Sequence, residues 1–405
     1  MEFPTVAESP PACATSPATG IPHVVIGITH PQTCLNLTGR LRALRRAGFR
    51  VTLVSSPGEL LVTTARAQGA EPVAVPMRRE MAPFSDLVSL FRLWRLLRRL
   101  RPDLTEFSSP KAGLLGTVAA KLANVPARVY MLRGFRLDRA KGLKRRILLA
   151  SERVAATCAH VVLCNSESMM AEALDLRIAP ARKLKLLDKG SSNGVDLARF
   201  SPGRSDVRAQ LGIARDVPLI GFVGRLVRDK GVPELIQAFD IVLSAEPDTR
   251  LLLVGWFDEA EDALDPALQA RIRNHTHIHW TGFVEDPAAY YRVMDLLVLP
   301  TWREGFPNAV LEAAATGVPA VTTLSTGARD AVIPDVTGLL IPPGYPEAIA
   351  EAALKLLCDP ERRRRMGEAA RAWVAEHFSD THVLGLTAEF YKSLASGRQN
   401  GSRGT

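Results

Sequence analysis

The sequence predicts an α/β protein of two Rossmann-like domains, each a doubly wound parallel sheet, that face each other across a central cleft. Short apolar segments alternate with amphipathic ones along the 405 residues, which is the βαβα order of parallel sheets covered by helices on both faces. This order is interrupted by the turn-rich, non-periodic segment 191–203. A chain of this length also exceeds one typical hydrophobic core, so we expect two domains.

The expected strands of the first half are apolar runs bounded by polar or turn residues, at 23–28, 51–54, 73–75, 103–107, 129–132 and 160–163. Helices are expected between them, including 37–48, which ends at a glycine, 86–100 and 113–122. The expected strands of the second half are 218–223, 251–254, 278–280, 296–299, 320–322 and 339–341. Ligands of such sheets bind beyond the carboxyl ends of the strands, so two facing domains place the reaction in the cleft between them.

The composition is that of a globular protein, with 47% hydrophobic and 23% charged residues. No apolar run reaches the roughly 18 residues that a membrane-spanning helix requires. The first 20 residues carry Glu2 and Glu8 and lack a continuous apolar segment, so we do not expect a secretory signal. The five cysteines include no C-x2-C pair, which argues against a zinc site or a disulfide framework and fits a reducing cytoplasm.

The run 304–312 is the most informative segment, because it places the carboxylates of Glu304 and Glu312 on either side of a predicted helix start. Pro307 suits the first helical position. The backbone amides there, with the helix dipole, form an anion site suited to a diphosphate. Glu312 lies about 7.5 Å further along the axis, within reach of ribose hydroxyls, and Glu304 would face hydroxyls of a transferred sugar. An ordinary helix with a glutamate at each end is the alternative. We expect the residues between the two acids to contact the nucleotide sugar that donates this sugar. They are Gly305, Phe306, Pro307, Asn308, Ala309 and Val310.

A second anion-binding element follows the strand at 218–223, in the run Gly224-Arg225-Leu226-Val227-Arg228-Asp229-Lys230-Gly231. Gly224 permits close approach of the backbone, Arg225 offers a planar fork to phosphate oxygens, and Lys230 offers a point charge. These cations would stabilise the negative charge that develops on a leaving nucleoside diphosphate. A basic loop on the protein surface is the alternative.

Metal chemistry has little support in the sequence. No Asp-x-Asp pair occurs, so the usual carboxylate bridge for Mg²⁺ or Mn²⁺ on a diphosphate is missing. His275, His277 and His279 alternate like ligands on one face of a strand, but no acid or cysteine partners them locally, and a half-exposed strand explains the spacing. The negative charge of the diphosphate would be stabilised by Arg225, Lys230 and the helix start in place of a metal ion. We therefore expect no metal ion and no cofactor.

Positive charge is concentrated in the first half of the chain. Residues 1–190 hold 29 Lys and Arg against 14 Asp and Glu, a net charge of +15, whereas residues 191–405 carry −6. The cations gather in an amphipathic stretch at 91–101 and in a cluster at 133–146. An anionic membrane surface is one expected partner, and a solvated helix that faces its own core is the alternative. The charge does not form a basic patch interleaved with aromatic residues of the kind that binds nucleic acid, so nucleic acid is not expected as a partner.

The motifs of the second half resemble those of the retaining GT-B glycosyltransferases of family 4. The resemblance rests on the E-x7-E run with its Gly-Phe turn at 304–312, the G-R-x4-K-G run at 224–231, and Gly282-Phe283-Val284. It extends over roughly 23–395 and is most specific from 221 to 340. It implies a GT-B fold, contacts of Arg225 and Lys230 with the donor pyrophosphate, and a nucleobase site at Phe283 and Val284.

Candidate acceptor-binding residues lie in the first half. Lys111 opens a predicted helix after a strand, beside backbone amides that favour anions. Similar P-K-A-G runs occur in the branch of family 4 that builds capsular, exopolysaccharide and lipid-linked oligosaccharide chains. The chain departs from many relatives at 29–32, which lacks their glycine-rich turn, and at 132–135, where Arg133 stands in place of their histidine. We expect Arg133 to bind a phosphate of the acceptor. His30 is the candidate to take the role of the relatives' histidine.

Together these features predict a retaining glycosyltransferase that moves a hexose or N-acetylhexosamine from a nucleoside diphosphate sugar, with UDP as the expected nucleotide. The expected acceptor is a glycan or a polyprenyl-diphosphate-linked sugar in surface polysaccharide synthesis. The predicted catalytic residues are Glu304, Arg225 and Lys230. The alternatives are a UDP-N-acetylglucosamine 2-epimerase of the same fold and a non-catalytic subunit that binds nucleotide sugars.

These roles divide the chain into five parts. Residues 1–20 and 396–405 are expected to be disordered tails, 21–200 an acceptor-binding domain, and 201–376 a nucleotide-sugar-binding domain. Residues 377–395 are expected to form a helix that crosses back to the first domain. We expect a cytoplasmic protein, peripheral on the inner face of the cell membrane where its basic domain meets lipid.

Overall fold

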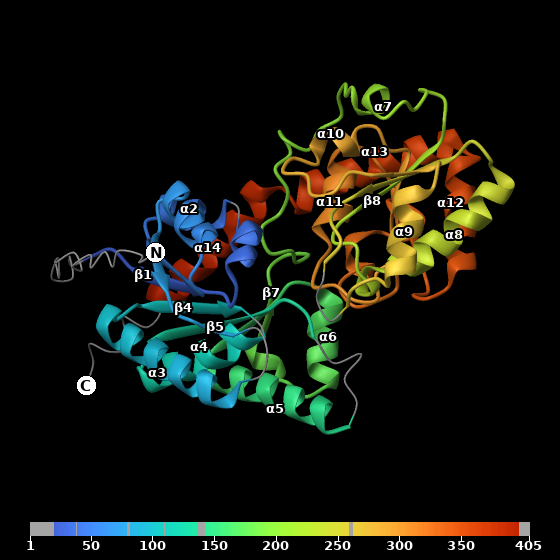
Figure 1. The fold of residues 1–405 in the computed structure, drawn as a ribbon. Helices are drawn as coiled ribbons and strands as arrows, with labels where there is room; N and C mark the ends of the chain where they lie inside the picture. The colour runs from blue at the N-terminus through green and yellow to red at the C-terminus, as the bar shows by residue number, and fades with distance from the viewer. Residues whose placement is uncertain are drawn as a thin grey trace, which may run out of the picture.

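A computed structural model describes residues 20–37, 39–78, 82–108, 110–135, 142–258 and 262–396. They form two α/β domains, each built on a parallel sheet with helices on both faces (Figure 1). The predicted fold class is confirmed. Apart from Gly20 and Ser396, the expected tails lie outside the described residues, as do Arg136, Arg139 and Lys141 of the predicted basic cluster.

The sheet of the first domain has the order β3-β2-β1-β4-β5-β6-β7, and its described strands are all parallel. Ile26 of the central strand β1 lies opposite Leu53 of β2 and Glu106 of β4. Strand β7 was not predicted, because Lys185 interrupts its apolar residues. The strands are β1 His23–Gly27, β2 Arg50–Ser55, β3 Glu71–Ala74, β4 Leu104–Ser108, β5 Ala127–Leu132, β6 Val161–Cys164 and β7 Leu184–Leu186.

The helices of this domain form two layers. Helices α3, α4 and α5 pack side by side on one face of the sheet, and α1 and the C-terminal α14 cover the other (Figure 1). The helix predicted at 37–48 is α1, which begins later than predicted because Gly39 takes a φ of 76° and separates it from a 3-10 helix. The elements are η1 Pro31–Leu37, α1 Arg40–Arg46, α2 Glu59–Ala67, α3 Pro83–Leu100, α4 Lys111–Leu122, α5 Gly142–Cys158, α6 Glu167–Asp175 and η2 Ala181–Lys183.

The second domain has a parallel sheet of order β10-β9-β8-β11-β12-β13. Its strands are β8 Leu219–Val223, β9 Arg250–Val254, β10 Ile278–Trp280, β11 Leu296–Leu299, β12 Ala320–Thr323 and β13 Gly338–Ile341. Its helices are α7 Val207–Gln210, η3 Arg228–Lys230, α8 Val232–Ala245, α9 Pro266–Asn274, α10 Ala288–Tyr291, α11 Asn308–Ala315, η4 Arg329–Ala331, α12 Pro346–Leu357 and α13 Pro360–His377. In both sheets the strand order reverses beside the first strand, between β1 and β4 and between β8 and β11, where ligands of this architecture bind.

The last helix, α14 (Asp380–Ser396), packs on α1 and β4 of the first domain. Tyr391 anchors it, because its buried hydroxyl donates to Glu106 and accepts from Arg40 at 3.1 Å. Arg40 also donates to Glu106 at 2.6 Å. Burial opposes ionisation of Glu106, but Arg40 and Arg133 nearby hold the pKa of this carboxyl below its usual value. A buried charge cluster therefore ties the end of the chain to the first sheet.

Candidate active site

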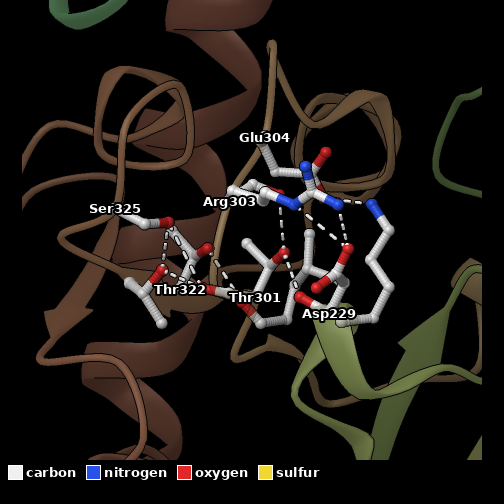
Figure 2. Close-up of polar contacts among 9 residues, drawn as sticks. Asp229, Thr301, Arg303, Glu304, Thr322 and Ser325 are labelled. Carbon is white, nitrogen blue, oxygen red and sulfur yellow. Dashed lines mark hydrogen bonds and ion pairs between the residues drawn. The ribbon is translucent and has the colours of Figure 1, made fainter. Parts of the chain in front are cut away.

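The loops that follow β8 and β11 meet where the strand order of the second sheet reverses (Figure 2). The carbonyl of Asp229 accepts a hydrogen bond from Thr301 Oγ1 at 3.1 Å. From β12, Thr322 Oγ1 donates to the carbonyl of Leu299 at 2.9 Å, and Ser325 Oγ just beyond it donates to that of Thr301 at 3.2 Å. These bonds fix the backbone of both loops, so side chains from either loop are held against each other.

Lys230 and Glu304, two of the predicted catalytic residues, are paired. Lys230 Nζ donates to Glu304 Oε1, and the two side chains are 21% and 12% exposed. The pair is therefore accessible but mostly shielded, where an ion pair is stronger than on an open surface. The structure brings together a cation and a carboxylate from opposite sides of the strand reversal, 74 residues apart in the chain.

Arg303, which was not predicted as a site residue, forms a second ion pair next to Lys230 and Glu304. Its Nε donates to Asp229 Oδ2 at 3.0 Å, and its Nη2 donates to the same oxygen (Figure 2). Its Nη1 donates to the carbonyl of Phe135, in the first domain, at 3.0 Å. Arg303 directly precedes Glu304, and Asp229 directly precedes Lys230. The Arg303–Asp229 ion pair therefore fixes the positions of Lys230 and Glu304. The sequence signal for this ion pair was a cation directly before Glu304 and a carboxylate directly before Lys230.

Gly305 allows the two domains to touch beside this site. A Cβ atom at this position would lie 2.2 Å from the carbonyl oxygen of Arg133, so a larger residue would push the domains apart. Contacts at α6 join the domains nearby. Ser168 Oγ accepts from the amide of Gly327 at 2.8 Å, and the Ser168 amide donates to Asp330 at 3.3 Å. Backbone contact therefore joins the two domains at the start of the 304–312 run.

Arg225 and the predicted nucleobase loop lie along the carboxyl ends of β8, β9 and β10. Arg225 Nη1 pairs with Asp258, after β9, at 2.6 Å. The Gly224 amide is bonded to Val254 at 2.9 Å. Phe283 is exposed and meets Trp256 edge-on, with ring centroids 5.4 Å apart, whereas Val284 packs against the core. Trp256 and Asp258 were not predicted, because the loop after β9 carries no motif.

The start of α11 differs in detail from the prediction. The helix begins at Asn308, and Pro307 precedes it with an extended conformation. The Pro307 carbonyl accepts from the Val310 amide at 3.1 Å, so this amide is engaged within the helix turn. Asn308 and Ala309 are half-buried at the helix start. Phe306 is buried against Phe378, with ring centroids 5.2 Å apart, so its side chain belongs to the core and is not open to a ligand.

Glu312 lies one turn into α11 and is held by a tyrosine. Tyr291 Oη donates to Glu312 Oε2 at 2.8 Å. Burial raises the pKa of Glu312, and the hydrogen bond from Tyr291 acts in the opposite direction. Burial and the neighbouring carboxylate also raise the pKa of Tyr291 well above its ordinary value. Tyr291 therefore stays a donor and orients the carboxylate.

The predicted acceptor residues are not arranged as one open anion site. Lys111 Nζ pairs with Asp86 of α3 at 2.8 Å, and the amide of Ala112 donates to Thr29 Oγ1 at 3.0 Å, so the chain itself occupies part of the helix start. His30 lies at the end of β1, and its Nδ1 accepts from the amide of Gln32 at 3.3 Å.

Arg133 follows β5 and reaches the buried cluster around Glu106. Its Nε and Nη2 atoms are shielded from solvent. Burial lowers the pKa of Arg133 to about 10, and Glu106 partly offsets this effect. Arg133 therefore lies close to the carboxylate of Glu106 on β4, and its predicted contact with acceptor phosphate stays a prediction.

In the ranges that the structure describes, no group of three or more His, Cys, Asp and Glu side chains could hold a metal ion. His277 Nδ1 lies 2.7 Å from Arg250 Nη1, so one of the three alternating histidines has a cation as its neighbour. Within the same ranges, no helix has the length and apolar character needed to cross a bilayer.

Comparison with known proteins identifies the class of this site. The model of the glycosyl transferases group 1 matches residues 203–373, and that of the glycosyl transferase 4-like domain matches residues 38–188. The chain is 36% identical over 361 residues to the capsular polysaccharide biosynthesis glycosyltransferase CapM of Staphylococcus aureus, covering 88% of this chain and 93% of that protein. It is 28% identical over 270 residues to the UDP-Gal:alpha-D-GlcNAc-diphosphoundecaprenol alpha-1,3-galactosyltransferase of Escherichia coli, covering 65% and 68%.

Solved structures share the fold of this chain. Anabaena Alr3699/HepE in complex with UDP-glucose superposes with a TM-score of 0.75 at 21% identity, covering 92% of this chain and 99% of that one. The two parallel-sheet domains therefore have the GT-B fold. The chain belongs to the glycosyltransferase family of the group 1 and 4-like domains, as the sequence motifs predicted.

Proposed function

We propose that this glycosyltransferase is a retaining enzyme that transfers a hexose or N-acetylhexosamine from a UDP-sugar to a glycan or polyprenyl-diphosphate-linked sugar in surface polysaccharide synthesis. The observation that carries the proposal is the Lys230–Glu304 pair at the reversal of the second sheet. The names of two relatives support the finer assignments, one a capsular polysaccharide enzyme and the other a transferase from UDP-Gal to a diphosphoundecaprenol-linked sugar.

In the proposed mechanism the donor lies across the carboxyl ends of β8 to β11. Lys230 and Arg225 stabilise the negative charge that grows on the diphosphate as the sugar departs. The amides and dipole at the start of α11 favour the same anion. Glu312, oriented by Tyr291, accepts hydrogen bonds from the ribose hydroxyls. With two cations and a helix start on the diphosphate, the proposed enzyme needs no metal ion.

Glu304 faces the transferred sugar and is not the nucleophile in this mechanism. Its carboxylate is engaged by Lys230, which reduces its tendency to attack carbon. The bond between the anomeric carbon and the phosphate oxygen breaks first, and the pair of electrons leaves with the diphosphate. The acceptor hydroxyl then attacks from the same face, and its proton passes to the departing phosphate oxygen. The anomeric configuration of the donor is retained.

A thermal-shift screen of UDP-, GDP- and ADP-sugars is the first test. A ligand at 100 times its dissociation constant stabilises the folded enzyme by about 2.7 kcal/mol, and we expect UDP-sugars to do so. Transfer to a lipid-linked acceptor is then followed with and without EDTA, and NMR gives the product anomer. An inverted product would contradict retention, and loss of activity with EDTA would contradict metal independence. Donor turnover without acceptor would indicate the epimerase, and binding without any turnover the non-catalytic subunit.

A further inference from the structure

Helix α3 carries two apolar stripes, and one of them faces solvent. Leu93, Leu96 and Leu97 are buried in the core of the first domain, as expected for an ordinary amphipathic helix. A separate stripe at spacings i, i+3, i+4 and i+7 occupies its first half and points outward. Phe84 is 91% exposed and Leu87 66% exposed, and the stripe continues through Val88 and Phe91. Exposure of large apolar side chains to water is unfavourable, so such a stripe marks an interaction surface.

Helix α5 presents a matching stripe in the same layer. Leu143 is 72% exposed, and Ile147, one turn later, is also exposed. Helices α3 and α5 both pack against α4 on one face of the sheet (Figure 1). We call the exposed apolar residues of the two helices the α3–α5 face, which consists of Phe84, Leu87, Val88, Phe91, Leu143 and Ile147.

The charges around the α3–α5 face are almost entirely positive. In α3, α4 and α5 the acidic side chains are Asp86, which is paired with Lys111, and Glu152, which is buried and accepts a hydrogen bond from Tyr130. The exposed cations next to the apolar stripes are Arg92, Arg95, Lys144, Arg145 and Arg146. An apolar surface rimmed by cations fits the boundary between anionic headgroups and acyl chains.

We propose that the α3–α5 face docks on an anionic lipid bilayer, with its apolar side chains inserted below the headgroups and its arginines among the phosphates. Each helix follows a parallel strand, so the first turns of α3, α4 and α5 all lie at the carboxyl edge of the sheet. Arg133 and the contact with Gly305 lie at the same edge. Docking would therefore bring the mouth of the cleft to the membrane, where a lipid-linked acceptor resides. This last step rests on the proposed function, whereas the docking itself does not.

The test uses the full-length protein and vesicles of phosphatidylcholine with and without phosphatidylglycerol. The apolar variant combines Phe84→Ser, Leu87→Ser and Phe91→Ser, and the charge variant combines Arg92→Gln, Arg145→Gln and Arg146→Gln. A matched control combines Arg98→Gln, Arg99→Gln and Arg101→Gln, which removes the same charge from the other end of α3. All these side chains are exposed, so folding should be unaffected, and a thermal unfolding curve checks this.

We expect the wild-type protein to sediment with anionic vesicles and to dissociate as salt rises. The charge variant should bind on the order of 100-fold more weakly, since each basic side chain near the surface contributes about 1 kcal/mol. The apolar variant should lose the binding that persists at high salt, and the control should change much less than either. Trp94 lies beside Phe91, with ring centroids 5.6 Å apart, so a vesicle-dependent fluorescence change should disappear in Trp94→Phe.

Equal binding to neutral vesicles, or equal losses in the charge variant and its control, would overturn the proposal. Concentration-dependent self-association that the apolar variant abolishes, without any vesicle binding, would assign the α3–α5 face to a second copy of the chain instead. Transfer to a water-soluble acceptor analogue separates this proposal from the proposed function. Both surface variants should retain that activity, and the KM for a vesicle-bound acceptor should rise.

Discussion

The ion pair between Arg303 and Asp229 should control the position of Lys230 and Glu304. Arg303→Gln removes two hydrogen bonds to a carboxylate that is 9% exposed and one bond to the first domain. Removing one partner of a buried pair costs about 3–5 kcal/mol. Arg303 itself is 27% exposed, so we expect about 2–3 kcal/mol of stability to be lost. Because the pair adjoins both proposed catalytic side chains, a shift of about 1 Å should lower kcat by about 100-fold.

A double-mutant cycle with Arg303→Gln and Asp229→Asn isolates this pair from other effects of each substitution. The coupling energy in urea unfolding should be about 2 kcal/mol, and kcat of the double variant should be no lower than that of Arg303→Gln alone. Arg228 and Asp265 provide a matched control in the same loop, because their pair is 3.3 Å long and more than half exposed. Its coupling should not exceed about 0.5 kcal/mol. Equal coupling in the two cycles, or wild-type kcat in Arg303→Gln, would refute the positioning role.

Three further predictions concern the two glutamates of the E-x7-E run, the domain contact and a buried carboxyl. Glu304→Gln should lower kcat by about 100-fold or more, whereas Glu312→Gln should mainly raise the donor KM, and similar kcat losses in both would contradict their separate roles. Gly305→Ala should open the cleft, seen as a larger radius of gyration and a lower kcat, while Gly385→Ala in open space on α14 should leave both unchanged. Burial raises the pKa of Glu152 from 4.5 to about 7, so its contribution to stability is present below pH 4.5 and is lost as the pH rises to 7. Relative to wild type, Glu152→Gln should therefore gain about 2–3 kcal/mol between pH 5 and pH 8 in urea unfolding, and an unchanged difference would contradict the raised pKa.

The order of strands and helices and the class of the enzyme followed from the sequence alone. Hydrophobic periodicity is a local property, and a buried parallel strand such as Leu296–Leu299 is apolar throughout whatever lies beside it. Motif spacing is local too, so the runs 224–231 and 304–312 could be recognised before their positions in space were known. The parallel order then places both runs at one reversal of the sheet.

Only the tertiary structure decided which charges pair and which surfaces are covered. The Lys230–Glu304 pair joins residues 74 positions apart, and the bond from Arg303 to Phe135 joins residues 168 positions apart. No local pattern encodes such partners, because they depend on strand order and on how the domains meet. Arg133 illustrates the same limit, since the burial of its guanidinium beside Glu106 depends on β4 and β5 being neighbours. Helix α3 is apolar on two sides, and its packing against α4 and the sheet determines which stripe is buried in the core and which one stays exposed.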